Sequence, residues 1–222
     1  YGPCAFMDNY NPKTVFSSID KFGRYSFSNQ PPITKWNLAR FAECLIPLIH
    51  KDENEAIKVA SEIIDNFQNI YEEKWLNMMR DKLGLFGKDQ NDQKLINDLL
   101  SWMEINNADY TNTFCNLMNV NIEDKNVYED QKFINWVKIW EKRVLMNNNL
   151  KEKSLDLMRN TNPTVIPRNH KVEEALNAAN EDNIEVINKL LNVLSEPYSN
   201  QKNIENYQSL STDKEYQTFC GT

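Results

Sequence analysis

The sequence predicts a mainly α-helical protein that begins with an irregular arm. Apolar residues recur at helical spacing in nearly every segment after residue 33. Glycine, which disfavours helices, occurs only 5 times in 222 residues, whereas the first 32 residues are rich in proline and small turn-forming residues. We therefore expect an arm over residues 1–32 and one helical domain over residues 33–222, with no sheet beyond a short hairpin in the arm.

The first two predicted helices follow the arm. The apolar face of the first helix is formed by Leu38, Phe41, Ala42, Leu45, Ile46 and Ile49. Pro47 should kink or end this helix in its last turn, because proline lacks the amide hydrogen that the helix needs. A second, long helix should open at Asp52, where Glu55 three residues later matches a capping box, and continue until Gly84 stops it.

Five further helices are predicted along the rest of the domain. Their apolar positions span residues 95–103, 108–118, 133–144, 172–179 and 184–194. Residues 147–149, all asparagine, should form a helix end or loop. Asp182 and Glu185 match a second capping box at the start of the last helix.

Charge and hydropathy exclude two classes of partner. The net charge is −7 and no run of Lys or Arg is present, so we expect no nucleic-acid binding. No apolar stretch approaches the roughly 20 residues that a membrane span needs, so we expect no membrane insertion. The chain shows no secretory signal and is expected in the cytoplasm, and since it begins with Tyr1 rather than Met, we expect it to be part of a longer protein.

Cysteines and histidines show no metal-site spacing. They are scattered as Cys4, Cys44, Cys115, Cys220, His50 and His170. Zinc sites normally show clustered Cys and His, so no metal ligand is assigned. Cys44 and Cys115 lie in apolar helical stretches and are expected to be small buried hydrophobic residues, while both histidines are expected in structural or surface roles.

The arm and the first helix carry the most specific motifs. Residues 1–43, YGPCAFMDNYNPKTVFSSIDKFGRYSFSNQPPITKWNLARFAE, closely resemble the selenoprotein O family of YdiU-type proteins. Members of that family show DYGPxxFMDxYxP followed by GRYxxxNQPxIxxWNLARxAE. Weaker matches follow in order: KLGL at 82–85, ADYTNTF at 108–114, NPTVIPRN at 162–169 and FCGT at 219–222.

The resemblance implies a protein-kinase-like fold that transfers AMP from ATP to Ser, Thr or Tyr hydroxyls of other proteins. This chain would be the helical C-terminal lobe, preceded by an activation-segment-like arm. The family's DYG aspartate binds the metal that bridges the nucleotide phosphates. Because this chain begins at the tyrosine of that motif, we expect the catalytic, ATP and magnesium ligands upstream, and assign no catalytic, cofactor or metal residue here.

Two consequences for partners follow from the same resemblance. The chain alone is expected to hold no cofactor and to be inactive, whereas the full-length protein would use ATP and magnesium. Its partners would be the N-terminal nucleotide-binding part and protein substrates. The alternative is a stand-alone helical interaction module whose acidic surface and aromatic-rich helices bind another protein.

Five arm residues are candidates for a substrate-positioning region: Gly23, Arg24, Tyr25, Asn29 and Gln30. They stand where a kinase places its activation and substrate-positioning loop. They either order this loop or receive protein substrate, or Arg24 and Asn29 simply satisfy backbone groups in a turn-rich connection. The sequence leaves both interpretations open.

The resemblance also makes Cys220 a candidate redox residue. Family members carry selenocysteine or cysteine near the C-terminus, and in some it forms a regulatory disulfide with an activation-segment cysteine. Phe16 stands at that partner position here, which leaves Cys4 as the other cysteine of the arm. A Cys4–Cys220 bond is one alternative, and a free thiol in a reducing cytosol is the one we expect.

Two arginines are assigned structural roles. Arg40 interrupts an apolar helical surface, so we expect it to form a buried ion pair or hydrogen-bonded anchor. Arg168 and Asn169 follow two prolines and are expected to form a turn that fixes the last two helices.

Overall fold

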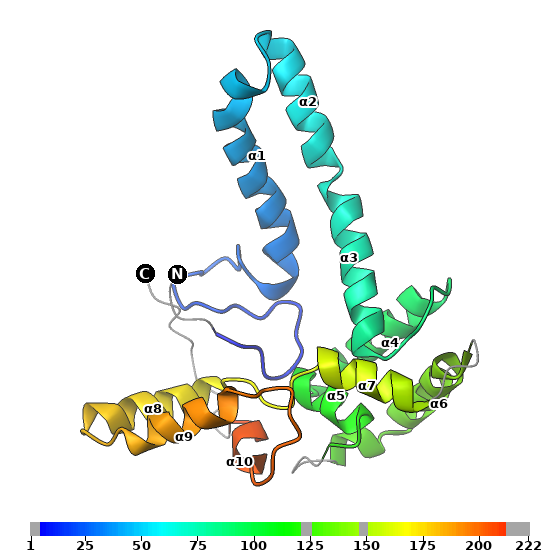
Figure 1. The fold of residues 1–222 in the computed structure, drawn as a ribbon, viewed down its shortest axis with the longest axis vertical. Coiled ribbons are helices and arrows are strands. Elements are labelled where there is room, and N and C mark those ends of the chain that lie inside the picture. Colours follow the sequence, from blue (N-terminus) through cyan, green and yellow to red (C-terminus); the bar gives the residue numbers. More distant parts are fainter. Residues whose placement is uncertain (1–4, 121–125, 147–150, 212–222) are drawn as a thin grey trace.

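The structure is a computed structural model that describes residues 5–120, 126–146 and 151–211. Helices joined by loops make up these ranges, and no strand occurs in them (Figure 1). One isolated antiparallel bridge joins Asn9 to Asp109. The mainly α prediction is therefore confirmed. No helix in the described ranges is both long and apolar enough to cross a membrane.

Residues 5–29, the described part of the arm ahead of the first helix, contain the short 3-10 helix η1 (Phe27–Asn29) and otherwise consist of turns, bends and irregular segments. Helix α1 (Gln30–Ile49) follows directly and starts before residue 33, the predicted domain start. Pro31 and Pro32 fall in its first turn, where the missing amide hydrogens are not needed. Pro47 lies two residues before the helix end, as predicted.

The predicted long second helix is two helices, α2 (Glu53–Asp65) and α3 (Phe67–Lys82). Asp52 caps α2 as predicted, and its carboxylate accepts hydrogen bonds from the amides of Asn54 and Glu55. The break falls at Asn66, whose side-chain oxygen accepts a hydrogen bond from Asn69 at 3.2 Å. Asparagine is a weak helix former because its side chain forms such local polar contacts, which explains the interruption.

Helices α1, α2 and α3 form a projection that rises away from the other helices (Figure 1). None of the α1 side chains is buried, and in α2 only Ala56 and Ala60 are. Several large apolar side chains of the projection are therefore exposed: Phe41, Leu48, Ile57, Ile63 and Ile70. Cys44 is also exposed, so its predicted burial is wrong.

The core lies at the base of the projection. It is built from the end of α3 together with α4 (Asp92–Asn106), α5 (Tyr110–Leu117), α6 (Gln131–Val144) and α7 (Lys151–Thr161), with η2 (Asn126–Glu129) between α5 and α6. Two core tryptophans satisfy their indole N–H groups internally: Trp136 donates to the carbonyl of Leu95 and Trp140 to that of Leu83. Such pairing removes the penalty of burying a polar N–H. Cys115 is buried here, as predicted.

The remaining helices are α8 (Asn169–Asn180), α9 (Glu185–Leu194) and α10 (Glu205–Gln208). The capping box predicted at Asp182 and Glu185 is wrong. Asp182 has a positive φ of 61° in the turn after α8, and Ile184 occupies the N-cap position of α9. The side-chain oxygen of Asn183 accepts the Glu185 amide instead, at 3.2 Å.

Gly84 ends α3 as predicted. Its missing side chain also allows α7, a helix that was not predicted from the sequence, to pack closely against it. Its φ is +66°, and a Cβ at this position would lie 2.6 Å from the carbonyl oxygen of Ser154 in α7. We expect Gly84→Ala to lower the free energy of unfolding by about 2–4 kcal/mol, because it combines backbone strain with a clash against backbone. Urea denaturation would measure the loss.

Gly23→Ala is the matched control for this prediction. Gly23 has the same backbone conformation, φ +64°, but its nearest atoms would lie 3.7 Å from an added Cβ. The control should therefore show the backbone strain alone, about 1 kcal/mol. Equal losses for the two variants would contradict the close approach of α7 to Gly84.

Candidate functional site

The arm lies against the segment that begins α5. The amide of Tyr10 donates to the carbonyl of Ala108 at 2.9 Å, and the amide of Tyr110 donates to the carbonyl of Asp8 at 2.8 Å. The Tyr10 ring stacks on the Tyr110 ring with centroids 5.8 Å apart. Backbone and side-chain contacts together fix where this part of the arm lies on the core.

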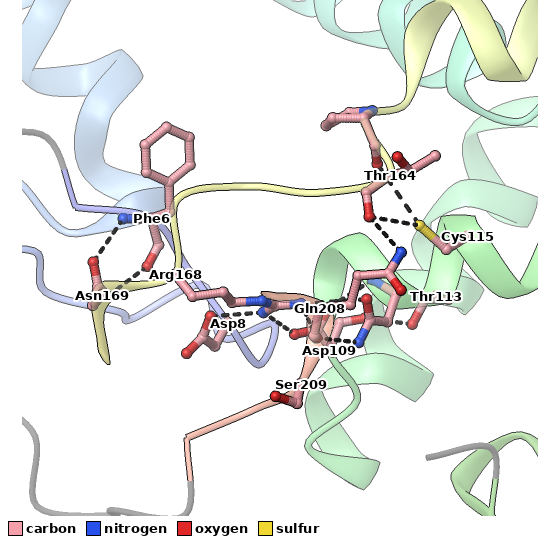
Figure 2. Close-up of polar contacts among 12 residues, drawn as sticks. Phe6, Asp8, Asp109, Thr113, Cys115, Thr164, Arg168, Asn169, Gln208 and Ser209 are labelled. Atoms are coloured by element: carbon pink, nitrogen blue, oxygen red, sulfur yellow. Dashed lines mark hydrogen bonds and ion pairs between the residues drawn. The ribbon is translucent and has the colours of Figure 1, made fainter. Parts of the chain in front are cut away.

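Arg168 connects three segments that are distant in the sequence (Figure 2). Its guanidinium donates to Asp8 Oδ1 of the arm at 2.7 Å and to Asp109 Oδ2 at the start of α5. A further hydrogen bond of 2.9 Å reaches the carbonyl of Gln208 in α10. The Arg168 side chain is only 1% exposed, so these contacts take the place of water at its two terminal nitrogens, whereas Nε has no hydrogen-bond partner among the described residues. Arg168 therefore does more than form the predicted turn before α8.

The electrostatics of this network come from one cation between two carboxylates. Burial raises the pKa of Asp109, while Arg168 and the amide of Asn112 oppose that shift. For Arg168, burial disfavours the charged form, but Asp109 and Asp8 outweigh it and raise the pKa of the guanidinium. Because a guanidinium stays protonated in proteins, the network is an ion-pair anchor, and it holds no proton-transfer pair.

Cys115 lies close to this network but is not a nucleophile. Burial raises the pKa of its thiol to about 12, with a further contribution from Asp109. The reactive thiolate form is therefore absent at neutral pH. This agrees with the predicted role of Cys115 as a small buried residue.

The candidate arm residues lie together at the turn that leads into α1. The Asp20 carboxylate accepts the amides of Arg24 and Tyr25, each at 2.8 Å, and the Asn29 side chain donates to the carbonyl of Arg24. Asn29 thus satisfies backbone, as one interpretation expects. The Arg24 guanidinium instead lies exposed over the Trp36 ring, 4.8 Å from its centroid, and remains available to a partner.

Arg40 belongs to the same exposed surface, which corrects its predicted burial. Its guanidinium lies 5.5 Å from the Trp36 centroid and pairs with Glu43 at 2.7 Å, with about half of each side chain exposed. The apolar surface around Arg40 faces solvent rather than the core, so the charge needs no buried partner. Cys4 and Cys220 lie outside the described residues.

Comparison with known proteins shows the family to which the chain belongs. A family model described as "Protein adenylyltransferase SelO" matches residues 1–195. The chain belongs to the SelO/YdiU family. It is 57% identical over 224 residues to the "Protein nucleotidyltransferase YdiU" of Pelagibacter ubique and 49% identical over 225 residues to that of Nitrosococcus oceani. A Clostridium botulinum protein of the same name is 51% identical over 225 residues.

Each of these alignments covers all of this chain but 46% of the relative. This SelO/YdiU chain therefore spans about half the length of the curated relatives it matches. Among the described residues, no three His, Cys, Asp or Glu side chains gather into a metal site.

Several residues whose contacts were not predicted from the sequence lie within the motifs that carry the family resemblance. Asp8 belongs to FMD, Lys82 to KLGL, Asp109 to ADYTNTF, and Asn162 and Arg168 to NPTVIPRN. Up to 160 residues apart in sequence, these segments meet around the arm. The motifs were therefore the signal for this site that the sequence contained. That they lie together in space is shown only by the structure.

Proposed function

We propose that this chain is the helical C-terminal part of a protein adenylyltransferase that transfers AMP from ATP to Ser, Thr or Tyr hydroxyls of other proteins. The observation that carries this proposal is the meeting of the family motifs at the Arg168 anchor, which holds the arm on the core through Asp8. The family match over residues 1–195 supports the nucleotidyl-transfer chemistry.

We further propose how this part contributes to the whole protein. Residues 33–222 would act as the C-terminal lobe of a kinase-like fold, with residues 1–32 as its activation-segment-like arm. ATP and magnesium would be bound by the part of the longer protein outside this chain. The exposed Arg24 and Tyr25, held by Asp20, would face the protein substrate.

The cytoplasm is the proposed compartment. Cys44 and Cys115 are free thiols, which agrees with a reducing environment.

Nucleotide labelling tests the proposed reaction. The full-length protein that contains this chain, supplied with magnesium and ATP labelled on its α-phosphate, should label protein hydroxyls and increase their mass by one AMP. The 222-residue chain alone should give no label. Transfer of label from the γ-phosphate instead would show a kinase, and labelling by the chain alone would place the nucleotide site within it.

A second function is favoured by the exposed apolar residues of the α1–α3 projection. Surfaces of this kind mark protein interaction sites, so the chain would be a helical interaction module. This alternative requires that the full-length protein transfers neither AMP nor phosphate and that the chain alone binds a protein partner. AMP transfer by the full-length protein would reject it as the primary function.

A further inference from the structure

A cavity of about 340 Å³ lies between the arm and the ends of α3 and α5, beside the Arg168 anchor. The arm contributes Phe6, Phe16 and Phe27 to its wall, and α5 contributes Tyr110 and Phe114. Aromatic rings therefore line much of it. Its volume is in the range of small-molecule sites, and its lining suits an apolar or aromatic body.

Lys82 is the one basic residue that lines this cavity in the described part of the chain. It is only 9% exposed, and its ammonium lies 4.2 Å from the centroid of Phe114 and 5.2 Å from that of Tyr110. No carboxylate of the described residues pairs with it. Burial lowers the pKa of Lys82 to about 8, as expected for an ammonium with incomplete compensation.

The titratable neighbours of Lys82 do not supply the missing anion. Burial raises the pKa of Tyr110 well above its usual value and that of Cys115 to about 12, so both are neutral at physiological pH. The buried carboxylate of Asp109 is already paired with Arg168. The two ring faces stabilise the ammonium only partly, since a cation over a ring is weaker than an ion pair.

Asn162, which also lines the cavity, carries a second unpaired polar atom. Asn162 is 1% exposed, and its amide nitrogen donates to the carbonyls of Lys82 and Met158 at 2.8 and 2.9 Å. Because carbonyl oxygens can only accept, both bonds must come from the amide nitrogen, and the other side of the amide is the oxygen. The remaining atom, Oδ1, is buried without a hydrogen-bond partner among the described residues. The wall of the cavity therefore carries one unpaired charged donor, the ammonium of Lys82, whereas Asn162 Oδ1 is buried behind that wall.

We propose that this cavity is a binding site for a carboxylate attached to an aromatic or other apolar body. Lys82 would pair with the carboxylate, and the phenylalanines would enclose the body. A single ammonium suits a singly charged carboxylate better than a phosphate dianion, which normally engages several donors. The proposal is independent of the AMP-transfer reaction.

Two sources could supply the carboxylate: a free small molecule, or an Asp or Glu side chain elsewhere in the full-length polypeptide. The probe for the first is 3-phenyllactate, and its uncharged control is the corresponding diol, 3-phenyl-1,2-propanediol. Calorimetry on the full-length protein should show the acid binding about tenfold or more tighter than the diol. NMR of ¹³C-methylated lysines should show the pKa of Lys82 rising when the acid binds.

Lys82→Met separates this role from a structural one. Methionine keeps the apolar stem, so the variant should still bind the diol and lose only its preference for the acid. Lys88→Met, which removes an exposed lysine outside the cavity, should retain that preference. A preserved preference in Lys82→Met would overturn the assignment of Lys82.

The second source predicts a different result in the same protein. The pKa of Lys82 should already be near that of a free lysine before any probe is added, and phenyllactate should not bind. A water-soluble carbodiimide should then join Lys82 to one Asp or Glu, which peptide mapping would identify. A Lys82 pKa that stays near 8 with phenyllactate present, with no crosslink, would show that only water meets the ammonium and would overturn the proposal.

Discussion

Arg168→Met should lower the free energy of unfolding of this chain by about 3–5 kcal/mol, the range expected when one partner of a buried ion pair is removed. Methionine fills a similar space but leaves Asp8 and Asp109 without their shared cation. Asp8 is 24% exposed and can be hydrated, whereas Asp109 is 3% exposed and cannot. Most of the loss should therefore come from the uncompensated charge of Asp109.

Urea denaturation of wild type and variant would measure this loss, and Arg159→Met is its matched control. Arg159 forms an exposed ion pair with Asp156 within α7, so its loss should change stability by less than about 0.5 kcal/mol. Hydrogen exchange adds a second readout, because the amides of Tyr10 and Tyr110 should lose protection when the arm detaches. A loss below about 1 kcal/mol with both amides still protected would contradict the anchor.

Asp92→Ala should be comparably destabilising, by about 3–5 kcal/mol, because it leaves two buried guanidinium groups facing each other. Asp92 Oδ2 accepts from Arg80 Nε at 2.6 Å, and Asp92 Oδ1 accepts from Arg143 Nε at 2.7 Å. All three side chains are less than a tenth exposed. The triad joins α3, α4 and α6, so its loss weakens the centre of the core.

The control for this variant is Asp98→Ala, which removes an exposed carboxylate paired with Lys94 in the same helix. It should change stability by less than about 0.5 kcal/mol in the same urea denaturation. Replacing the triad by Arg80→Met, Asp92→Leu and Arg143→Met together should recover much of the loss, because a matched apolar set carries no unpaired charge. Failure of Asp92→Ala to exceed its control would contradict the buried triad.

The pH dependence of this effect has a definite sign. Burial tends to raise the pKa of Asp92, but hydrogen bonds from Arg143 and Arg80 outweigh it and lower the pKa below its usual value. The ionised group therefore stabilises the fold above the unfolded-state pKa of about 4, and this contribution is lost as pH falls through the lower folded-state value. The difference between wild type and Asp92→Ala should shrink below about pH 4.

Much of the fold was predictable from the sequence because its signals are local. The helical period located α4, α5, α6, α8 and α9, and the Asp52 cap and the Gly84 stop depend on residues within one turn. Local signals failed where they were weak or competed. Asn66 divided a helix predicted as continuous, and α7 presents only two buried side chains, Ser154 and Met158, too few to show a period.

The candidate site shows the same contrast between local sequence signals and contacts made only in the folded structure. The motifs that name the family are short runs that can be recognised in the sequence alone, and they contain Asp8, Lys82, Asp109 and Arg168. The roles of those residues could not be predicted, because each depends on partners from 28 to 160 positions away. Sequence spacing carries no information on such contacts.

Arg40 and Arg168 illustrate the physical reason. The sequence predicted Arg40 in a buried ion pair or hydrogen-bonded anchor, and Arg168 in a turn. In the structure Arg40 is half exposed, and Arg168 is the buried centre of an ion network. Composition, helical period and family motifs were determined by the sequence by itself. Which charge is desolvated, and which carboxylates compensate it, was decided only by the tertiary structure, because burial depends on segments that packing brings together from distant parts of the chain.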